Sequence, residues 1–331
     1  MNLYECERYV CTKETLKDTL ESYGIAIIPR VLNETECDNL VNGLWSFFQH
    51  ISQSWQKPIQ RDDETTWREI LKLLPHRSMV YQHWQTGQNQ TVWDIRQNPK
   101  IVDICAHFYN CEPTDLLVSF DGISFLLPPE VTRCGWTDAK QANANYHTDQ
   151  CSKRNKNSQE TLQSWVTGLD VDEGDGTLAF LEGSHRHYKD CGKAFSHIRE
   201  DQWYDKTKKD RVMQFYASRG CEEKRIKCPR GSLVLWDSRT VHCGLGALKG
   251  RFLPKLRAVV YLCYMPRVHC SDRDMAKKRK YMDDLRMTRH LPHIINVFAK
   301  VPKTYGKEIP LLTYPEPPVL SALGKRLAGF D

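Results

Sequence analysis

The segment "NYHTDQ" places His147 and Asp149 two residues apart in a run that reads as a β-strand. Residues i and i+2 of a strand project from the same face, so the imidazole and the carboxylate are expected side by side. Together they can fill two coordination positions of a divalent ion. The pair does not decide the matter alone, because it is also compatible with ordinary loop polarity.

A third ligand is available from "GSLVLWDSRTVHCG", where His242 ends a later β-rich run. Two histidines and one carboxylate on one side of an ion, with open positions opposite, suit non-haem Fe(II) and oxygen chemistry. We therefore predict that His147, Asp149 and His242 bind one Fe(II) and form the catalytic centre.

Arg257 follows His242 by 15 residues, inside the strand-like run "LRAVVYLCY". A buried strand arginine is costly unless it is paired, and its planar fork suits a carboxylate. It could form an internal salt bridge or lie at the surface. A carboxylate cosubstrate beside the metal explains its position better. Arg251 is a rival, but it lies in the Gly- and Lys-rich stretch "GALKGRFLPK".

The elements that must position these residues change in character along the chain. Asn33 and Glu36 form a capping box at the start of an apolar-striped helix. From about residue 115 the chain has short strand-like runs separated by turn residues, which is typical of a jelly roll. These runs are "DLLVSFDGISFLLP", "NYHTD", "LQSWVTGLDV", "GTLAFLEGS", "EKRIKCP", "GSLVLWDSRTVH" and "KLRAVVYLCYM".

We expect one mainly β domain spanning residues 1–331, with flanking helices. It should comprise a helical N-terminal part of about 1–112, packed outside one sheet, and a jelly-roll core of about 113–268. A C-terminal helix and tail of about 269–331 should follow. The basic run "AKKRKYMDDLR" is interpreted as a solvated helix face.

Composition sets wider bounds on function. There are 47 basic and 41 acidic side chains, a net charge of +6, which permits an anionic ligand without demanding nucleic acid. Thirteen cysteines occur without a C-x-x-C pair, the N-terminal residues are polar, and no apolar run of about 18 residues exists. These features predict a cytoplasmic protein with reduced thiols and no membrane span; a nuclear location stays open.

The H-x-D pair, the distal histidine and the strand arginine resemble the Fe(II)/2-oxoglutarate dioxygenases. Within them, "GDGTLAFLEGSHRHY" is similar to a run of the phytanoyl-CoA hydroxylase-like branch, as are "ESYGIAIIPRVLNETECDNL" and "GSLVLWDSRTVHCG". The likeness covers most of residues 15–265. Glu182 replaces the proline of that branch, and the His242–Arg257 interval is longer than usual.

The resemblance implies a double-stranded β-helix (jelly roll, cupin-like) with the metal ligands at its open mouth. It implies Fe(II), 2-oxoglutarate and O2 as cofactor and cosubstrates, with Arg257 holding the far carboxylate of 2-oxoglutarate. It also implies hydroxylation of an unactivated carbon, with release of succinate and CO2.

Further residues are candidates for the same site. Gln163 and Trp165 share a strand face and could line the cosubstrate pocket or simply pack. Ser124 could bond a 2-oxoglutarate carboxylate or a neighbouring strand. Arg186 is expected to shape the mouth and meet an anionic substrate, or to be a solvated turn residue. Asn145 is a further candidate for substrate contact.

Three functions stay open. We favour oxidation of a small molecule or an amino-acid side chain. A nucleic-acid- or protein-modifying oxygenase would need aromatic stacking platforms. Tryptophans are available for this in an irregular segment that reads more like a substrate lid: Trp55, Trp67, Trp84 and Trp93. The third possibility is a non-catalytic, cupin-like metal-binding module. The sequence leaves the oligomeric state undetermined.

Overall fold

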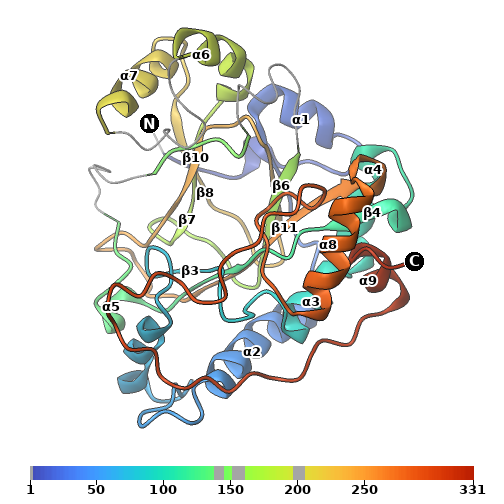
Figure 1. Ribbon diagram of the computed structural model, residues 1–331. Coiled ribbons are helices and arrows are strands. Elements are labelled where there is room, and N and C mark those ends of the chain that lie inside the picture. Colours follow the sequence, from blue (N-terminus) through green and yellow to red (C-terminus); the bar gives the residue numbers. More distant parts are fainter. Residues whose placement is uncertain (1–2, 138–144, 151–160, 197–205) are drawn as a thin grey trace.

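The computed structural model describes residues 3–137, 145–150, 161–196 and 206–331, and its β-strands form two sheets (Figure 1). The smaller sheet has the order β1 (Tyr4–Glu5), β8 (Glu223–Ile226), β7 (Thr177–Leu181), β10 (His242–Leu245). The larger has the order β2 (Ile25–Ile28), β9 (Leu233–Asp237), β6 (Leu162–Thr167), β11 (Arg257–Pro266), β5 (Ile123–Leu126), β3 (Val80–Tyr81), and β4 (Leu116–Val118) pairs with β11.

The larger sheet is apolar on both faces because it separates two packed layers. Trp165, Trp236 and Val259 point toward the smaller sheet and pack on its Leu178 and Phe180. Leu235, Val260 and Leu262 alternate with them along the same strands and face the opposite way. They join the main core cluster, which also contains the buried side chains of α2. Nearly all the strand pairs are antiparallel. The predicted jelly roll with flanking helices is confirmed.

The helices cover the outer faces of the two sheets (Figure 1). Those associated with the larger sheet or the N-terminal region are α1 (Leu16–Tyr23), α2 (Glu34–Ile51), α3 (Gln90–Arg96), α4 (Pro99–Tyr109), α5 (Pro129–Thr132), α8 (Asp272–Asp283) and α9 (Ala322–Leu327). On the smaller sheet lie α6 (Tyr188–Ala194) and α7 (Lys206–Ala217). Segments of 3-10 helix occur at Glu7–Tyr9, Glu64–Leu73, Pro113–Asp115, Ser184–His187 and Arg267–His269.

The start of α2 follows the predicted capping box. The Asn33 side chain accepts a hydrogen bond from the Glu36 backbone N–H, and the Glu36 carboxylate accepts one from Asn33 N–H. These bonds satisfy two of the donors that every helix start leaves unpaired. The long helix is thereby fixed against the outer face of the larger sheet, as expected.

The N-terminal part is less purely helical than expected. β1 pairs with β8 in the smaller sheet, while β2 and β3 extend the larger sheet beside β9 and β5. The first 112 residues therefore share hydrogen-bonded sheets with the core. This arrangement supports our proposal that the chain forms one domain.

Two local expectations are wrong. "NYHTD" is not a regular strand: His147 forms only an isolated antiparallel bridge with His242. His242 does not end the preceding strand but begins β10, after a turn that follows Asp237. The two histidines nevertheless become direct neighbours, because that bridge joins their backbones.

The basic run also departs from expectation, since α8 carries a fully buried Lys278.

No described helix is long and apolar enough to cross a bilayer. No disulfide joins the cysteines within the described ranges.

Candidate functional site

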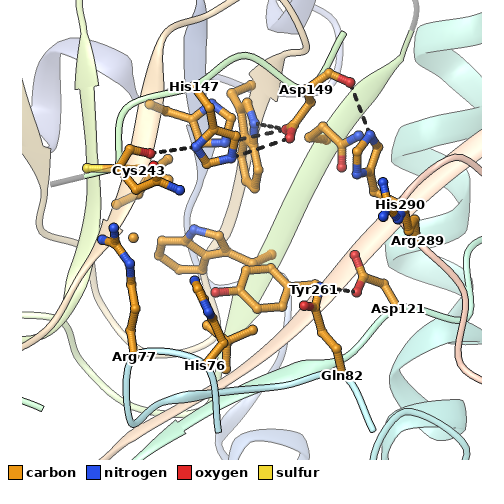
Figure 2. Close-up of a pocket in the computed structure, with 18 of the residues that line it drawn as sticks. His76, Arg77, Gln82, Asp121, His147, Asp149, Cys243, Tyr261, Arg289 and His290 are labelled. Atoms are coloured by element: carbon orange, nitrogen blue, oxygen red, sulfur yellow. Dashed lines mark hydrogen bonds and ion pairs between the residues drawn. The ribbon is translucent and has the colours of Figure 1, made fainter. Parts of the chain in front are cut away.

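His147, Asp149 and His242 converge on one cavity, and Figure 2 shows His147 and Asp149 close together on its wall. One potential ligand atom from each of the three lies within 4.8 Å of the others. His147 Nε2 is 3.7 Å from Asp149 Oδ1, and His242 Nε2 is 3.4 Å from Asp149 Oδ2. Two imidazoles and one carboxylate at this spacing are a suitable donor set for a non-haem iron.

Backbone carbonyls fix the orientation of both imidazoles. His147 Nδ1–H donates to the carbonyl of Asn145 at 2.8 Å, and His242 Nδ1–H donates to that of Thr240 at 2.9 Å. A carbonyl can only accept, so the proton must sit on Nδ1 when each ring is neutral. The lone pair of each Nε2 is thus directed to the side of Asp149, as a metal ligand requires.

Asp149 is held from two sides. Trp236 Nε1–H donates to Asp149 Oδ2 at 3.0 Å, and His290 Nε2 lies 3.0 Å from the Asp149 backbone carbonyl, to which it donates. The first contact comes from β9 and the second from the segment after α8. Neither residue was singled out from the sequence, because neither lies near the H-x-D motif along the chain.

The local electrostatics favour ligands that are ready to bind a cation. Burial and the neighbouring His242 lower the pKa of His147 to about 4, so its imidazole is neutral near pH 7. Burial opposes ionisation of Asp149, but the imidazoles of His242 and His290 outweigh it and lower the pKa of that carboxyl. A divalent ion binds the unprotonated form of each group.

The three residues line a cavity of about 670 Å³. Its other walls come from β6, β9, β10, β11, the segment 76–82 and the segment 289–298. The polar or aromatic lining residues include His76, Arg77, Gln82, Asp121, Asn145, Gln163, Trp165, Thr177, Trp236, Arg257, Tyr261, Arg289, His290, Asn296 and Phe298. This volume is ample for a dicarboxylate and an organic substrate together.

Arg257 lies at the start of β11, is 7% exposed and borders the cavity. Its Nε–H donates to Ser124 Oγ at 3.1 Å and its Nη1–H to the Gly176 carbonyl at 2.6 Å. Its guanidinium lies 5.2 Å from the Trp165 ring. Within the described ranges no carboxylate pairs with it. The Tyr261 hydroxyl lies within reach of its guanidinium; burial raises the pKa of that tyrosine, and the guanidinium opposes the shift. A buried cation in that state is well suited to an anionic ligand.

The rival Arg251 is fully committed to internal contacts. It donates to both oxygens of Glu130 at 2.9 Å and to Asp175 Oδ1 at 2.8 Å. Its side chain is only 2% exposed and does not border the cavity. The predicted preference for Arg257 over Arg251 as the carboxylate-binding residue therefore has a physical basis.

The remaining predicted residues divide into three groups. Gln163, Trp165 and Asn145 all line the cavity. Ser124 is fully buried and acts through its bond to Arg257. Arg186 lies exposed in the turn after β7, and the structure does not bring it to the cavity.

The interpretation of the four tryptophans as a lid is wrong. Trp55, Trp84 and Trp93 are buried in the main core, Trp67 packs against it, and none of them lines the cavity. Each indole N–H is satisfied within the protein. The same irregular segment does reach the cavity, but through residues 76–82.

Several residues that line the cavity were missed in the sequence: Gln82, Asp121, Tyr261, Arg289 and His290. Tyr261 could have been found, because it lies four residues beyond Arg257 on the same strand face and pairs with Trp165. The others lie in turns or in the segment after α8. In such irregular segments the sequence has no period from which the direction of a side chain can be predicted.

Comparisons with known proteins agree with this geometry. The family model "Phytanoyl-CoA dioxygenase (PhyH)" matches residues 20–246, more than half of the chain. The Ava biosynthesis cluster protein O of Aspergillus versicolor is 26% identical over 240 residues, which cover 70% of this chain and 72% of that protein.

GIG2 illustrates the fold, and a second solved structure shows a weaker likeness. GIG2, from GlcNAc Inducible Gene 2 of Candida albicans, is 12% identical and matches with a TM-score of 0.59, over 96% of this chain and 76% of that one. The epimerase SnoN, in complex with Fe3+, alpha ketoglutarate and nogalamycin RO, is 15% identical with a TM-score of 0.44, over 77% and 84% of the two chains. At these identities the likeness concerns the fold alone.

The family match confirms the resemblance inferred from the sequence. With the His–Asp–His cluster, it also confirms the prediction of iron and 2-oxoglutarate as cofactors. The residues present fit both groups: the cluster offers two nitrogens and a carboxylate, and Arg257 offers a buried cation without a carboxylate partner among the described residues.

Proposed function

The chain belongs to the phytanoyl-CoA dioxygenase family, and from that premise we propose that it hydroxylates an unactivated carbon of a small-molecule substrate. The observation that carries the proposal is the convergence of His147, Asp149 and His242 on a cavity that also holds the buried Arg257. These are the parts that an iron- and 2-oxoglutarate-dependent oxygenase needs, and they lie in a single cavity.

In this proposal, His147, Asp149 and His242 hold the iron through the two Nε2 atoms and the carboxylate. Bound iron and 2-oxoglutarate supply the oxidising power for the O2-dependent attack on a carbon–hydrogen bond, with release of succinate and CO2. The protein contributes positioning and a cavity that limits the access of water. The two backbone carbonyls that anchor the imidazoles would keep these ligands in place without rearrangement.

Arg257 is proposed to bind the far carboxylate of 2-oxoglutarate. Ser124 and the Gly176 carbonyl hold two of its N–H groups, which turns the rest of the guanidinium toward the cavity. Gln163 and Trp165 form the wall beside it. Asn145 borders the open part of the cavity, where a substrate would lie.

A small-molecule substrate is favoured by the relative from a biosynthesis cluster and by the buried tryptophans, which provide no stacking platform for nucleic-acid bases. An amino-acid side chain presented by a protein stays compatible with the same cavity. The choice between hydroxylation and another oxidative outcome rests on product analysis.

The first test is formation of succinate from 2-oxoglutarate with added Fe(II). His147→Ala and Asp149→Ala should remove iron-dependent turnover and weaken Mn(II) binding measured by calorimetry, with the circular-dichroism spectrum preserved. Full turnover in either variant would refute the ligand assignment. Metal binding without any 2-oxoglutarate consumption would instead favour the cupin-like binding module.

The second test compares the two buried arginines. A charge-assisted pair contributes about 1.5–3 kcal/mol, so Arg257→Ala should raise the KM for 2-oxoglutarate by about 10–150-fold. Arg257→Lys keeps the charge but loses the fork, so its KM should lie between those of wild type and Arg257→Ala.

Arg251→Ala is the matched control. It should lower thermal stability, because Asp175 and Glu130 lose their buried partner, while the KM for 2-oxoglutarate stays near the wild-type value. If Arg251→Ala raised the KM and Arg257→Ala did not, the two roles would be reversed.

A further inference from the structure

Asp121 lies in the turn between β4 and β5 and faces the cavity from the wall opposite His147 (Figure 2). It is only 8% exposed. Its backbone is fixed, because Arg96 Nη2–H donates to the Asp121 carbonyl at 2.7 Å. The next residue must be glycine, since a Cβ at Gly122 would lie 1.9 Å from the Tyr81 carbonyl oxygen. The position of this carboxylate is therefore tightly determined.

The two oxygens of Asp121 have different surroundings. Oδ1 accepts hydrogen bonds from the Gly122 backbone N–H at 2.7 Å and from Gln82 Nε2–H at 3.2 Å. Across residues 3–137, 145–150, 161–196 and 206–331, Oδ2 has no hydrogen-bond donor and no cation forms an ion pair with this carboxylate. Oδ2 is open to the cavity, so a carboxylate with little exposure and no cationic partner is presented there to a ligand.

Burial raises the pKa of Asp121, and the nearby His290 and Arg96 oppose that shift without forming an ion pair with its carboxylate. His290 Nε2–H donates to the Asp149 carbonyl instead. The buried Arg96 directs its guanidinium to the backbone carbonyls of Gly87 and Asp121 rather than to the carboxylate. Arg289, on the same side of the cavity in Figure 2, is exposed and makes no ion pair with Asp121. The negative charge of Asp121 is thus left facing the cavity.

Gln82 adds a second acceptor on this wall. The pairing of β3 with β5 brings Gln82 beside Asp121, and the Gln82 Nε2–H donates to Asp121 Oδ1. The carboxylate cannot donate in return, so the amide orientation is settled and Gln82 Oε1 is left as an acceptor. That oxygen has no donor among the described residues. Two acceptors side by side, one of them charged, are suited to a group rich in N–H donors.

We propose that Asp121 and Gln82 form a subsite that binds a cationic nitrogen group, such as a primary ammonium, of the substrate. This inference rests on the proposed function and adds the chemical class of substrate to it. The ammonium would donate to Asp121 Oδ2 and Gln82 Oε1 and compensate the buried charge. The carbon to be oxidised would then lie between this subsite and the metal ligands.

The test measures thermal stabilisation of the protein loaded with Mn(II) and 2-oxoglutarate by three probes of equal length: butylamine, 1-butanol and butyrate. At about ten times its Kd, a probe should raise the melting midpoint by about 2–4 °C. We expect butylamine to give the largest rise in wild type, and the Asp121→Asn variant to lose that rise. Asp18→Asn, on the exposed face of α1, is the matched control and should keep it.

Stabilisation by 2-oxoglutarate alone is recorded in the same experiment. If it is absent in wild type, the proposed function fails. If it is present, but butylamine is no better than 1-butanol or butyrate, the ammonium subsite is refuted and the function stands. Preference for butyrate would assign substrate recognition to the arginines of the cavity instead. A butylamine effect that survives Asp121→Asn would also overturn the assignment.

Asp121→Asn is isosteric and retains an acceptor for Gly122 and Gln82. Without probes it should melt at or above the wild-type midpoint, because an uncompensated buried charge is removed. A midpoint several degrees lower would show that the carboxylate is a structural anchor, and this too would refute the subsite.

Discussion

At the scale of single residues, the three proposed metal ligands are oriented by groups outside the His–Asp–His cluster. His147 and His242 are oriented by carbonyls two residues earlier, and Asp149 by the indole of Trp236. Because Asp149 Oδ2 already accepts a hydrogen bond from Trp236, Oδ1 is the oxygen better placed to bind a metal ion. The indole thereby limits rotation of the carboxylate.

We predict that Trp236→Phe weakens Fe(II) or Mn(II) binding by about 10–100-fold, because the ring is kept but the N–H that holds Asp149 is lost. Anaerobic calorimetric titration measures the change. Trp84→Phe is the control, since it removes an indole bond to the Leu73 carbonyl outside the cavity. Equal metal affinity in wild type and Trp236→Phe would mean that Asp149 is positioned by the backbone alone.

At the scale of elements, α8 is more than a solvated helix. Lys278 is fully buried, and its ammonium donates to the Val118 carbonyl and lies 3.9 Å from the centre of the Phe120 ring. Burial, with the nearby Arg96, lowers its pKa from 10.5 to about 7. The side chain therefore joins α8 to the end of β4 and titrates where an ordinary lysine does not.

This shift predicts a pH dependence of stability. Between about pH 7 and 10.5 the unfolded chain holds the Lys278 proton and the folded chain releases it, so the free energy of unfolding should rise with pH. Measured against Lys278→Met by urea denaturation, wild type should gain about 1 kcal/mol between pH 7.5 and 8.5. A pH-independent difference would indicate that Lys278 stays charged in the fold.

At the scale of the whole molecule, the cavity is assembled from distant parts of the chain. Segment 76–82, the β4–β5 turn and segment 289–298 all border it, although they are far apart in the sequence. The chain after α8 then crosses the outside of the molecule and ends in α9 (Figure 1). Trp55 Nε1–H donates to the Leu311 carbonyl along this path, and Leu327 enters the main core.

We predict that Leu327→Ala lowers the free energy of unfolding by about 2–5 kcal/mol, because this fully buried side chain would leave a cavity in the core. Leu311→Ala, in the same segment but 77% exposed, should change it by less than about 0.5 kcal/mol. Denaturant titration distinguishes the two. Equal effects would mean that α9 contributes little to the core.

The sequence by itself determined those features of the fold and the site that depend on local backbone geometry. Short β-rich runs bounded by turn residues identified the strands that carry Trp165 and Arg257, and side-chain chemistry at short range identified the Asn33 cap. The pairing of His147 with Asp149 could also be predicted, because residues two apart in extended chain share a face even when the segment forms only a single bridge.

Only the tertiary structure decided which charges are compensated. Arg251 is paired with Glu130 and Asp175, whereas Arg257 has no carboxylate partner among the described residues. Arg186 does not line the cavity, and Lys278 is buried on a helix that the sequence predicts to be solvated. Pairing and burial depend on contacts between residues far apart in the chain, and turn geometry sets which way a loop side chain points. Asp121 faces the cavity for that reason, since the backbone around it is fixed by Arg96 and Gly122.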